Sequence, residues 1–252
     1  SDTGIQYKAI NSCIRLAHSV HGMAVWTAQD LTQADGTPHP VQAALRNHHA
    51  TQCGFCTPGF AMSLFGLYQN KVCHQQAITP DVAQHHLSGN LCRCTGYRPL
   101  VDAACSLNDA PLVQTDETAL RKQLDKIHPR ALSSDNPYLQ PLTLTELLHC
   151  CNTYPKAQLV AGCTDVGLWV TKMHKDFPRV LDVTQVAELR RVEQYPHHIA
   201  IGAAVTLTDA FAALVADRPQ LATFASRFAG LPVRNAGTLG GNVANGSPIG
   251  DS

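Results

Sequence analysis

Two segments decide the fold of the first half of this 252-residue chain: Gln-Cys-Gly-Phe-Cys-Thr-Pro-Gly at 52–59 and Leu-Cys-Arg-Cys-Thr-Gly-Tyr-Arg-Pro at 91–99. Each segment holds two cysteines that are too closely spaced for a relaxed disulfide between them. Four converging thiolates are the ligands that a [2Fe-2S] cluster or a structural zinc ion requires. The two segments therefore predict a metal centre.

The spacing of the second cysteine pair bears on which metal it binds. Structural zinc sites use Cys-x(2–4)-Cys pairs, because the backbone amides of the loop wrap around both sulfurs. Here only Arg93 separates Cys92 from Cys94, which disfavours such a loop and favours two thiolates on one iron of a two-iron cluster. Zinc ligation and two pairs of buried free thiols stay open as alternatives at this point.

With their flanking residues, the two segments resemble the helical [2Fe-2S] domain of the xanthine dehydrogenase family of molybdenum hydroxylases. The resemblance implies a four-helix domain over 36–107. It also implies that the cluster ligands are Cys53, Cys56, Cys92 and Cys94. Apolar spacing and first-turn prolines independently predict helices at 40–49, 58–70, 82–87 and from 97 or 99 to 107.

Residues 1–35 resemble a remnant of the ferredoxin-like [2Fe-2S] domain that precedes this domain in the family. We expect a helix at Tyr7–Val20 and a strand at Met23–Leu31. The resemblance implies that Cys13, in Asn-Ser-Cys, is the last ligand of that domain's cluster, without its three partners. A buried thiol on a helix is the structural alternative for Cys13.

The second half of the chain begins after a predicted linker at 108–141, where prolines and serines interrupt one helical pattern at Glu117–Ile127. Beyond it, helices are expected at 143–154, 166–172 and 206–215, and strands at 158–161, 179–183 and 198–202. The predicted class is therefore α+β, with a helical bundle, a linker and an α/β domain. A G-x-G-x-x-G fingerprint is absent from this half, so a Rossmann domain is not supported.

Two glycine-containing segments of the second half are candidates for binding a phosphate-bearing cofactor. Leu159–Gly167 places a glycine turn between a strand and a helix, where backbone amides collect. Arg234–Asn245 has closely spaced glycines, which let the backbone approach a ligand, and side chains that donate hydrogen bonds. Taken alone, the second segment is equally well explained as a turn between strands.

In this order, after an iron–sulfur domain, the two segments resemble the N-terminal part of the family's PCMH-like FAD-binding domain, over 142–252. On this resemblance the fold is incomplete at both ends, and both segments grip the FAD pyrophosphate. The implied FAD-binding residues are Leu159, Val160, Gly162, Cys163, Thr164, Asp165 and Val166, followed by Phe228, Gly237, Thr238, Gly241, Asn242, Asn245 and Asp251. Relatives often carry Asn in place of Cys163, so its backbone is expected to make the contact.

The order of iron–sulfur and FAD domains on one chain resembles the small-subunit type of this family. The resemblance implies a hetero-oligomer in which a molybdenum-cofactor-bearing large subunit oxidises a purine, and electrons pass through [2Fe-2S] to FAD and NAD. No residue of this chain is expected to act as acid, base or nucleophile. The alternatives are an aldehyde or nicotinate-type hydroxylase, and a non-catalytic zinc-binding or iron–sulfur sensor module.

Composition excludes some classes of partner. Lys plus Arg and Asp plus Glu number 19 each, so no basic surface predicts a nucleic-acid partner. No apolar run has the length of a membrane span or a secretory leader. Ten cysteines without a leader are typical of a reducing compartment, and we expect a soluble, cytoplasmic protein that does not contact a membrane.

Overall fold

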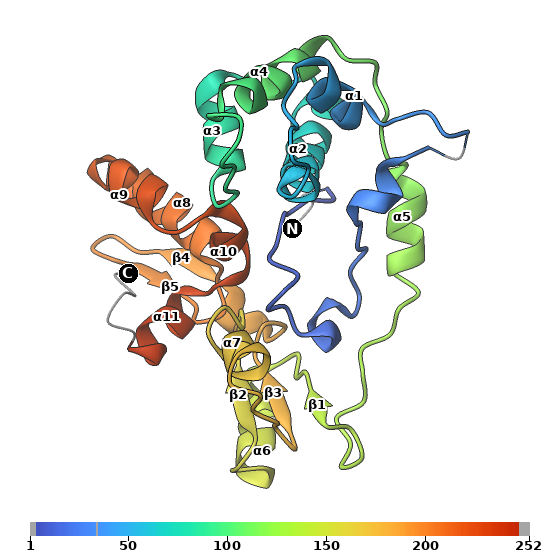
Figure 1. Ribbon diagram of the computed structural model, residues 1–252. Coiled ribbons are helices and arrows are strands. Elements are labelled where there is room, and N and C mark those ends of the chain that lie inside the picture. The colour runs from blue at the N-terminus through green and yellow to red at the C-terminus, as the bar shows by residue number, and fades with distance from the viewer. Residues whose placement is uncertain (1–3, 34, 247–252) are drawn as a thin grey trace. The chain divides into compact units, whose positions relative to one another are not determined.

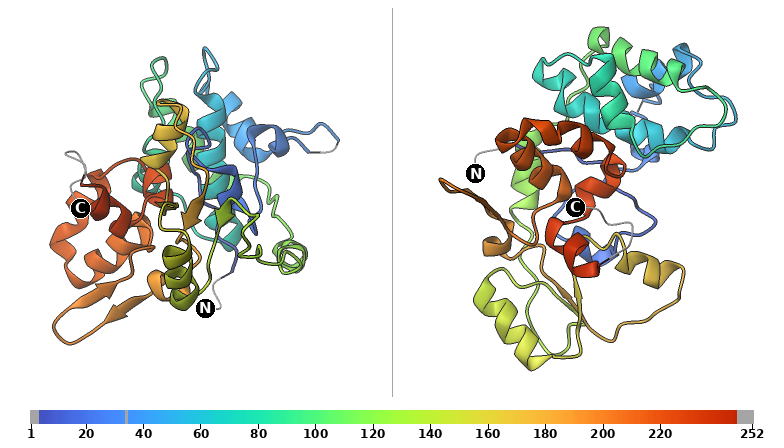
Figure 2. Two further views of the ribbon diagram at one scale, coloured as in Figure 1. Left: turned by 90° about the horizontal axis from the view of Figure 1, so that it is seen from below. Right: turned by 90° about the vertical axis from the view of Figure 1, so that its left-hand side faces the viewer.

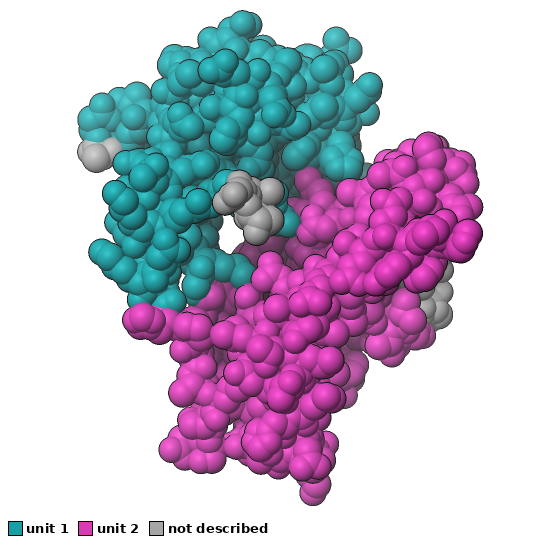
Figure 3. All heavy atoms as spheres, turned by 180° about the vertical axis from the view of Figure 1, so that it is seen from behind, with its two compact units in different colours: residues 1–9, 22–127 teal, residues 10–21, 128–252 magenta. Residues whose placement is uncertain are grey.

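The computed structural model describes residues 4–33 and 35–246, which fall into two compact units (Figures 1 and 3). The first unit comprises Ser1–Ala9 and Gly22–Ile127, and the second comprises Ile10–His21 and His128–Ser252. Helices dominate the first unit, and the second combines helices with two small sheets. This mixed architecture confirms the predicted α+β class.

Four helices form the body of the first unit. They are α1 (Pro40–Asn47), α2 (Thr57–Asn70), α3 (Pro80–Leu87) and α4 (Arg98–Ser106). Each carries a proline in its first turn, where the missing N–H has no intrahelical partner to lose. The central helix is α2, whose Phe60, Leu64, Leu67 and Tyr68 are completely buried. The predicted four-helix arrangement is therefore confirmed, and a fifth helix, α5 (Glu117–Leu124), follows it.

The two elements predicted before the bundle are wrong. In place of the helix predicted at Tyr7–Val20, residues 7–16 are irregular and only the short 3-10 helix Ala17–Val20 follows. In place of the strand predicted at Met23–Leu31, residues 23–27 are irregular and lead into the 3-10 helix Ala28–Leu31. The reason is tertiary packing: the ring of Tyr7 lies 5.8 Å from that of Phe65 and 5.6 Å from that of Trp26. The backbone of Tyr7 bonds the side chain of Asn70 at both its N–H and its carbonyl.

A three-stranded parallel sheet organises the second unit. Its order is β1 (Tyr138–Leu139), β3 (Val180–Asp182), β2 (Gln158–Val160), with Tyr138 and Gln158 both paired with Val180. The crossovers contain α6 (Leu144–Thr153) and α7 (Val166–Thr171), as parallel strands require. Strands β2 and β3 were predicted, whereas β1 lies inside the predicted linker.

The remaining described elements of the second unit are a ribbon, four α-helices and the short 3-10 helices Ala187–Arg190 and Pro219–Leu221. Strands β4 (Val192–Gln194) and β5 (Ile199–Ile201) pair antiparallel and project as a ribbon (Figure 2). The helices that follow are α8 (Leu207–Asp217), α9 (Ala222–Arg227), α10 (Leu231–Ala236) and α11 (Leu239–Asn245). Among the described residues, no helix combines the length and apolarity needed to cross a bilayer.

A buried carboxylate ties the strands of the parallel sheet together. Asp182 of β3 is fully buried and accepts hydrogen bonds from the Tyr138 hydroxyl at 2.7 Å and from Gln140 Nε2 at 3.1 Å. Its other oxygen accepts from the Thr184 amide at 2.8 Å. Such partners are what a buried carboxylate requires.

Candidate cofactor sites

Both cysteine segments are loops that lead into helices of the first unit. Cys56 is the N-cap of α2, and Gly54 between Cys53 and Cys56 has a left-handed φ of 82°. In the second loop, Gly96 and Tyr97 are both left-handed, with φ of 66° and 69°, immediately before α4. Left-handed backbone turns each loop sharply beside its cysteines.

The structure brings the cysteines of the two loops together in two pairs. The thiols of Cys53 and Cys94 lie close enough to shift each other's pKa, as do those of Cys56 and Cys92. Within the described ranges, no group of three or more His, Cys, Asp or Glu side chains is gathered as for one metal ion. Four sulfurs presented as two pairs are a donor set that fits a [2Fe-2S] cluster.

Hydrogen bonds from the loops act unequally on the four thiols. The Thr95 hydroxyl, followed by the amides of Thr95 and Cys94, lowers the pKa of Cys92 to about 7. The Phe55 amide lowers the pKa of Cys53, whereas burial raises that of Cys56 and the bond from Cys53 raises that of Cys94. The two loops therefore place hydrogen-bond donors against Cys92 and Cys53 in particular.

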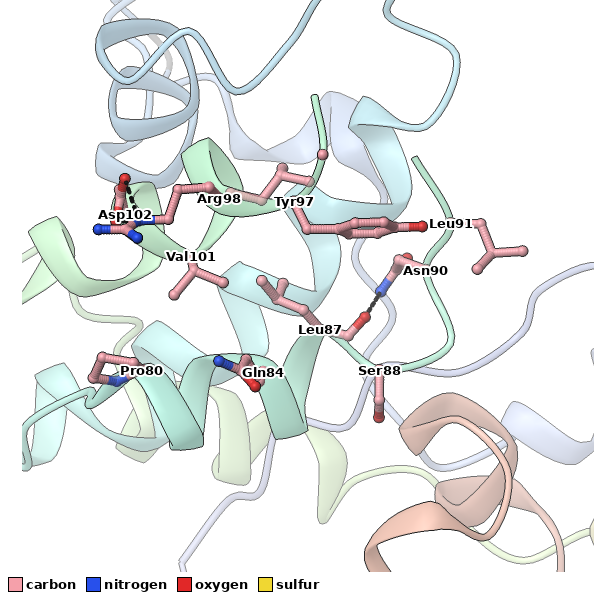
Figure 4. Close-up of a pocket in the computed structure, with 12 residues that line it drawn as sticks. Pro80, Gln84, Leu87, Ser88, Asn90, Leu91, Tyr97, Arg98, Val101 and Asp102 are labelled. Atoms are coloured by element: carbon pink, nitrogen blue, oxygen red, sulfur yellow. Dashed lines mark hydrogen bonds and ion pairs between the residues drawn. The ribbon is translucent and has the colours of Figure 1, made fainter. Parts of the chain in front are cut away.

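A hollow of about 680 Å³ lies between α3 and α4, beside the second cysteine loop (Figure 4). Tyr97 borders it, and Arg98 pairs with Asp102 at 3.0 Å on its rim. No cysteine lines it. The hollow therefore adjoins the second cysteine loop without including any of its sulfurs.

Cys13 lies in a different setting. It is exposed, in a turn at 12–14 of the second unit, so the alternative of a buried thiol on a helix is wrong. The four cysteines of the two paired loops belong to the first unit. Its role as a cluster ligand stays a prediction.

The first glycine segment follows β2 and packs against the second. A Cβ on Gly162 would lie 1.9 Å from the Ala236 carbonyl oxygen and 2.7 Å from the Gly237 Cα, so only glycine fits there. Cys163, next in the chain, has a left-handed φ of 59°. Its buried thiol has a pKa raised to about 12, chiefly by desolvation, so it stays protonated.

The second glycine segment meets the first through further close contacts. A Cβ on Gly237 would lie 3.4 Å from Thr164 Oγ1, and one on Gly241 would lie 3.8 Å from the Ala161 Cβ. Thr238 caps α11, and its Oγ1 accepts a hydrogen bond from the Gly241 amide at 3.0 Å. The fold thus brings together two segments far apart in sequence, and Gly162 permits their close packing because it has no Cβ.

The other predicted FAD residues are placed as follows. Val160 is buried, and its carbonyl accepts from the Val183 amide at 3.0 Å. Phe228 packs on the ring of Phe211, with centroids 5.2 Å apart. Asp165 is the N-cap of α7, which begins at Val166, and Thr164 is half-buried. Leu159 and Asn245 are exposed, Asn242 is half-buried, and Asp251 lies outside the described residues.

Sequence reasoning missed two features beside these segments. Thr95 and Tyr97 form a hydrogen-bond network around Cys92, for which the Thr-Gly-Tyr after the cysteines was the available signal. Arg234 is buried and donates to the Ala225 carbonyl, and its Nε and Nη2 have no hydrogen-bond partner within the described part of the chain.

Family models match both halves of the chain. A [2Fe-2S] binding domain matches residues 27–105, and the FAD binding domain in molybdopterin dehydrogenase matches residues 131–252. The chain carries the iron–sulfur and FAD-binding domains of the molybdenum hydroxylase family. Its cofactors are accordingly [2Fe-2S] and FAD.

Individual relatives of this family match nearly the whole chain. It is 32% identical to a xanthine dehydrogenase of Drosophila subobscura over 98% of this chain and 22% of that protein. It is 29% identical to xanthine dehydrogenase 1 of Arabidopsis thaliana over 100% of this chain and 23% of that protein. It is 30% identical to the abscisic-aldehyde oxidase of Arabidopsis thaliana over 93% of this chain and 20% of that protein.

The chain thus spans between a fifth and a quarter of the length of these relatives. Among solved structures, it is similar to quinoline 2-oxidoreductase from Pseudomonas putida 86. The identity is 27% and the TM-score 0.39, over 42% of this chain and 38% of that one.

Proposed function

We propose that this chain is the electron-transfer part of a xanthine dehydrogenase-type molybdenum hydroxylase. The observation that carries the proposal is the presence on one chain of paired cysteine loops and of packed glycine segments. Both lie within matches to the family's two cofactor-binding domains. The similarity to xanthine dehydrogenases over 98% of the chain supports the specific type.

In this proposal, Cys53, Cys56, Cys92 and Cys94 hold one [2Fe-2S] cluster in the domain at 36–107. Their convergence in two pairs supports this assignment. Cys13, in 1–35, is proposed as a ligand of a further cluster of the ferredoxin type, together with ligands that are not among these 252 residues, so this chain by itself holds one cluster.

The two glycine segments are proposed to hold FAD in the domain at 142–252. The backbone around Gly162 and Gly237 would contact the diphosphate, and the side chains of Thr164 and Asn242 flank it. Phe228 and Val160 would act through packing, because both side chains are taken up by the core. The bound cofactors would supply one-electron transfer at iron and hydride transfer at the flavin.

The electron source in this proposal is a purine such as hypoxanthine or xanthine, oxidised at a molybdenum cofactor on a partner subunit. The two electrons released would reach NAD through this chain. Residues of the chain contribute by holding the cofactors in place and excluding water from them. We propose a hetero-oligomer in the cytoplasm.

One further candidate has specific support. The chain is 30% identical to an abscisic-aldehyde oxidase, so an aldehyde can replace the purine as the electron source.

Anaerobic mixing of the holoenzyme with xanthine, an aldehyde or nicotinate tests the proposal. We expect xanthine to bleach the visible absorbance of the cluster and added NAD to restore it. The variant Cys92→Ser should abolish this response. If only the aldehyde bleaches the cluster, the substrate is an aldehyde and the purine assignment is wrong. If no substrate reduces the cluster, the electron-transfer role is contradicted.

A further inference from the structure

The Thr95 hydroxyl is held between two fixed groups of the second cysteine loop. Its Oγ1 accepts a hydrogen bond from the Tyr97 amide at 3.2 Å and donates to Cys92 Sγ at 3.2 Å. A hydroxyl has one hydrogen and two lone pairs. Since the amide can only donate to it, the hydrogen of Thr95 is left for the sulfur.

The loop itself fixes this arrangement. Gly96 and Tyr97 are both left-handed, which turns the chain back on Cys92. The Tyr97 hydroxyl then accepts from the Cys92 amide at 3.1 Å. The bond to the Tyr97 hydroxyl closes the loop from 92 to 97, and the separate bond from the Tyr97 amide orients Thr95 over the sulfur.

The sulfur that receives this bond differs from the other three. Cys92 is buried, at 7% exposure, whereas Cys53 and Cys94 are exposed and Cys56 is half-buried. A hydrogen bond away from water is electrostatically stronger than one at the surface. The Thr95 hydroxyl thus acts on the ligand where a single bond has most effect.

We propose that Thr95 is a positioning residue that raises the reduction potential of the [2Fe-2S] cluster through its hydrogen bond to Cys92 Sγ. The inference rests on the proposed function, which assigns Cys92 to the cluster. Reduction adds one electron, so negative charge on the ligating sulfurs increases, and a hydrogen-bond donor stabilises the reduced form. No bond of the chain breaks and no proton leaves Thr95 in this step.

Thr95→Val tests the proposal, because it removes the hydroxyl, keeps the shape and retains the backbone amide that also bonds Cys92. The measurement is the midpoint potential of the full chain, from a redox titration followed by paramagnetic resonance. We expect a more negative potential in Thr95→Val and a return towards the native value in Thr95→Ser. Deuterium exchange should shift the iron–sulfur stretching bands less in Thr95→Val than in Thr95→Ser.

Two control variants separate the hydroxyl from the loop. Tyr97→Phe removes the other bond that closes the loop but leaves the bond to sulfur, and should keep the native potential. Thr51→Val removes a nearby exposed hydroxyl that pairs with Thr57 at 2.7 Å, and should also have no effect.

Equal potentials in the native chain and Thr95→Val would overturn the inference. So would an equal shift in Tyr97→Phe, because loop closure would then set the potential. Loss of the cluster in Thr95→Val would overturn it as well, since Thr95 would be needed to build the site. A native chain without iron and sulfide would instead overturn the proposed function itself.

Discussion

In the first unit, four cysteine side chains carry the candidate cluster site, whereas in the second unit the candidate FAD site depends on glycines that have no side chain. Around Cys92 the surrounding atoms are hydrogen-bond donors that act on a sulfur. Around Gly162 they are backbone atoms of Ala236 and Gly237, within 3 Å of where a Cβ would lie. The cysteine site is therefore sensitive to the chemistry of a side chain, and the glycine site to its volume.

The largest effect is expected when a cysteine changes its chemistry and keeps its size. Cys92→Ser should remove the visible absorbance of the cluster, because a hydroxyl is a poor substitute for a thiolate on iron. Cys73→Ser, Cys105→Ser and Cys150→Ser are the controls, since none of these thiols lies in the two loops. A cluster that persists in Cys92→Ser, or is lost in the controls, would show that the ligands are misassigned.

The next effect is expected when a glycine of the second unit gains volume. Gly162→Ala should lower the free energy of unfolding by about 4 kcal/mol and abolish FAD binding, because the added methyl group would displace the backbone of Ala236 and Gly237. Chemical denaturation and an FAD titration measure the two effects. Gly4→Ala is the control, since its Cβ would first meet an atom at 3.7 Å. Unchanged FAD affinity in Gly162→Ala would show that the packing of Gly162 on Ala236 and Gly237 is not needed for FAD binding.

The sequence predicted the two sites unequally. The spacing of the cysteines indicated a metal centre, and the family resemblance supplied the ligand assignment. Helices α1 to α4 could be predicted from apolar spacing and first-turn prolines, because both signals are local. The short strand β1 could not, since two residues pair only when β3 is present beside them. The positions of Tyr7 and Trp26 depend likewise on Phe65 of α2, so their segments were wrongly given regular structure.

Within the candidate sites, too, local features could be predicted from the sequence and tertiary contacts could not. The two glycine segments were expected to bind one cofactor together; the structure places them in contact through Gly162 and Gly237, and their contacts with FAD stay a prediction. The Thr95 and Tyr97 network was not expected, because it depends on left-handed backbone at Tyr97 that few non-glycine residues adopt. Local patterns therefore indicated which residues matter, and only the loop geometry showed how they are connected.

A third effect concerns acid stability of the first unit. Burial lowers the pKa of His39 from 6.5 to about 4, and the ring packs edge-on against Phe65 and Tyr68. Because the pKa of His39 is lower in the folded chain than in the unfolded chain, protonation favours unfolding. The contribution of His39 to the free energy of unfolding is therefore complete above about pH 6.5, and up to about 3 kcal/mol is lost as the pH falls towards 4.

His39→Asn retains a side-chain acceptor for the Val41 amide and removes the titration, so it is the matched variant. We expect the melting temperature of the native chain to fall more steeply than that of His39→Asn between pH 6.5 and pH 4. Parallel curves for the two proteins would contradict the assignment.

The smallest effect separates a buried from an exposed tyrosine. Tyr138→Phe should lower the free energy of unfolding by about 1–2 kcal/mol, because the buried Asp182 loses a donor at 2.7 Å. Tyr195→Phe removes the same kind of bond, to Glu193 at 2.7 Å on the surface. It should have an effect within about 0.5 kcal/mol. Equal losses in the two variants would show that burial does not govern the strength of these bonds.

Metal and sulfide analysis of the anaerobically purified chain tests the central claim most directly, together with a paramagnetic resonance spectrum after reduction. The claim is that the paired thiols of Cys53, Cys56, Cys92 and Cys94 hold one [2Fe-2S] cluster. We predict about two iron and two sulfide per chain and a single [2Fe-2S] signal. Stoichiometric zinc without iron, or two distinct iron–sulfur signals from this chain, would contradict the account.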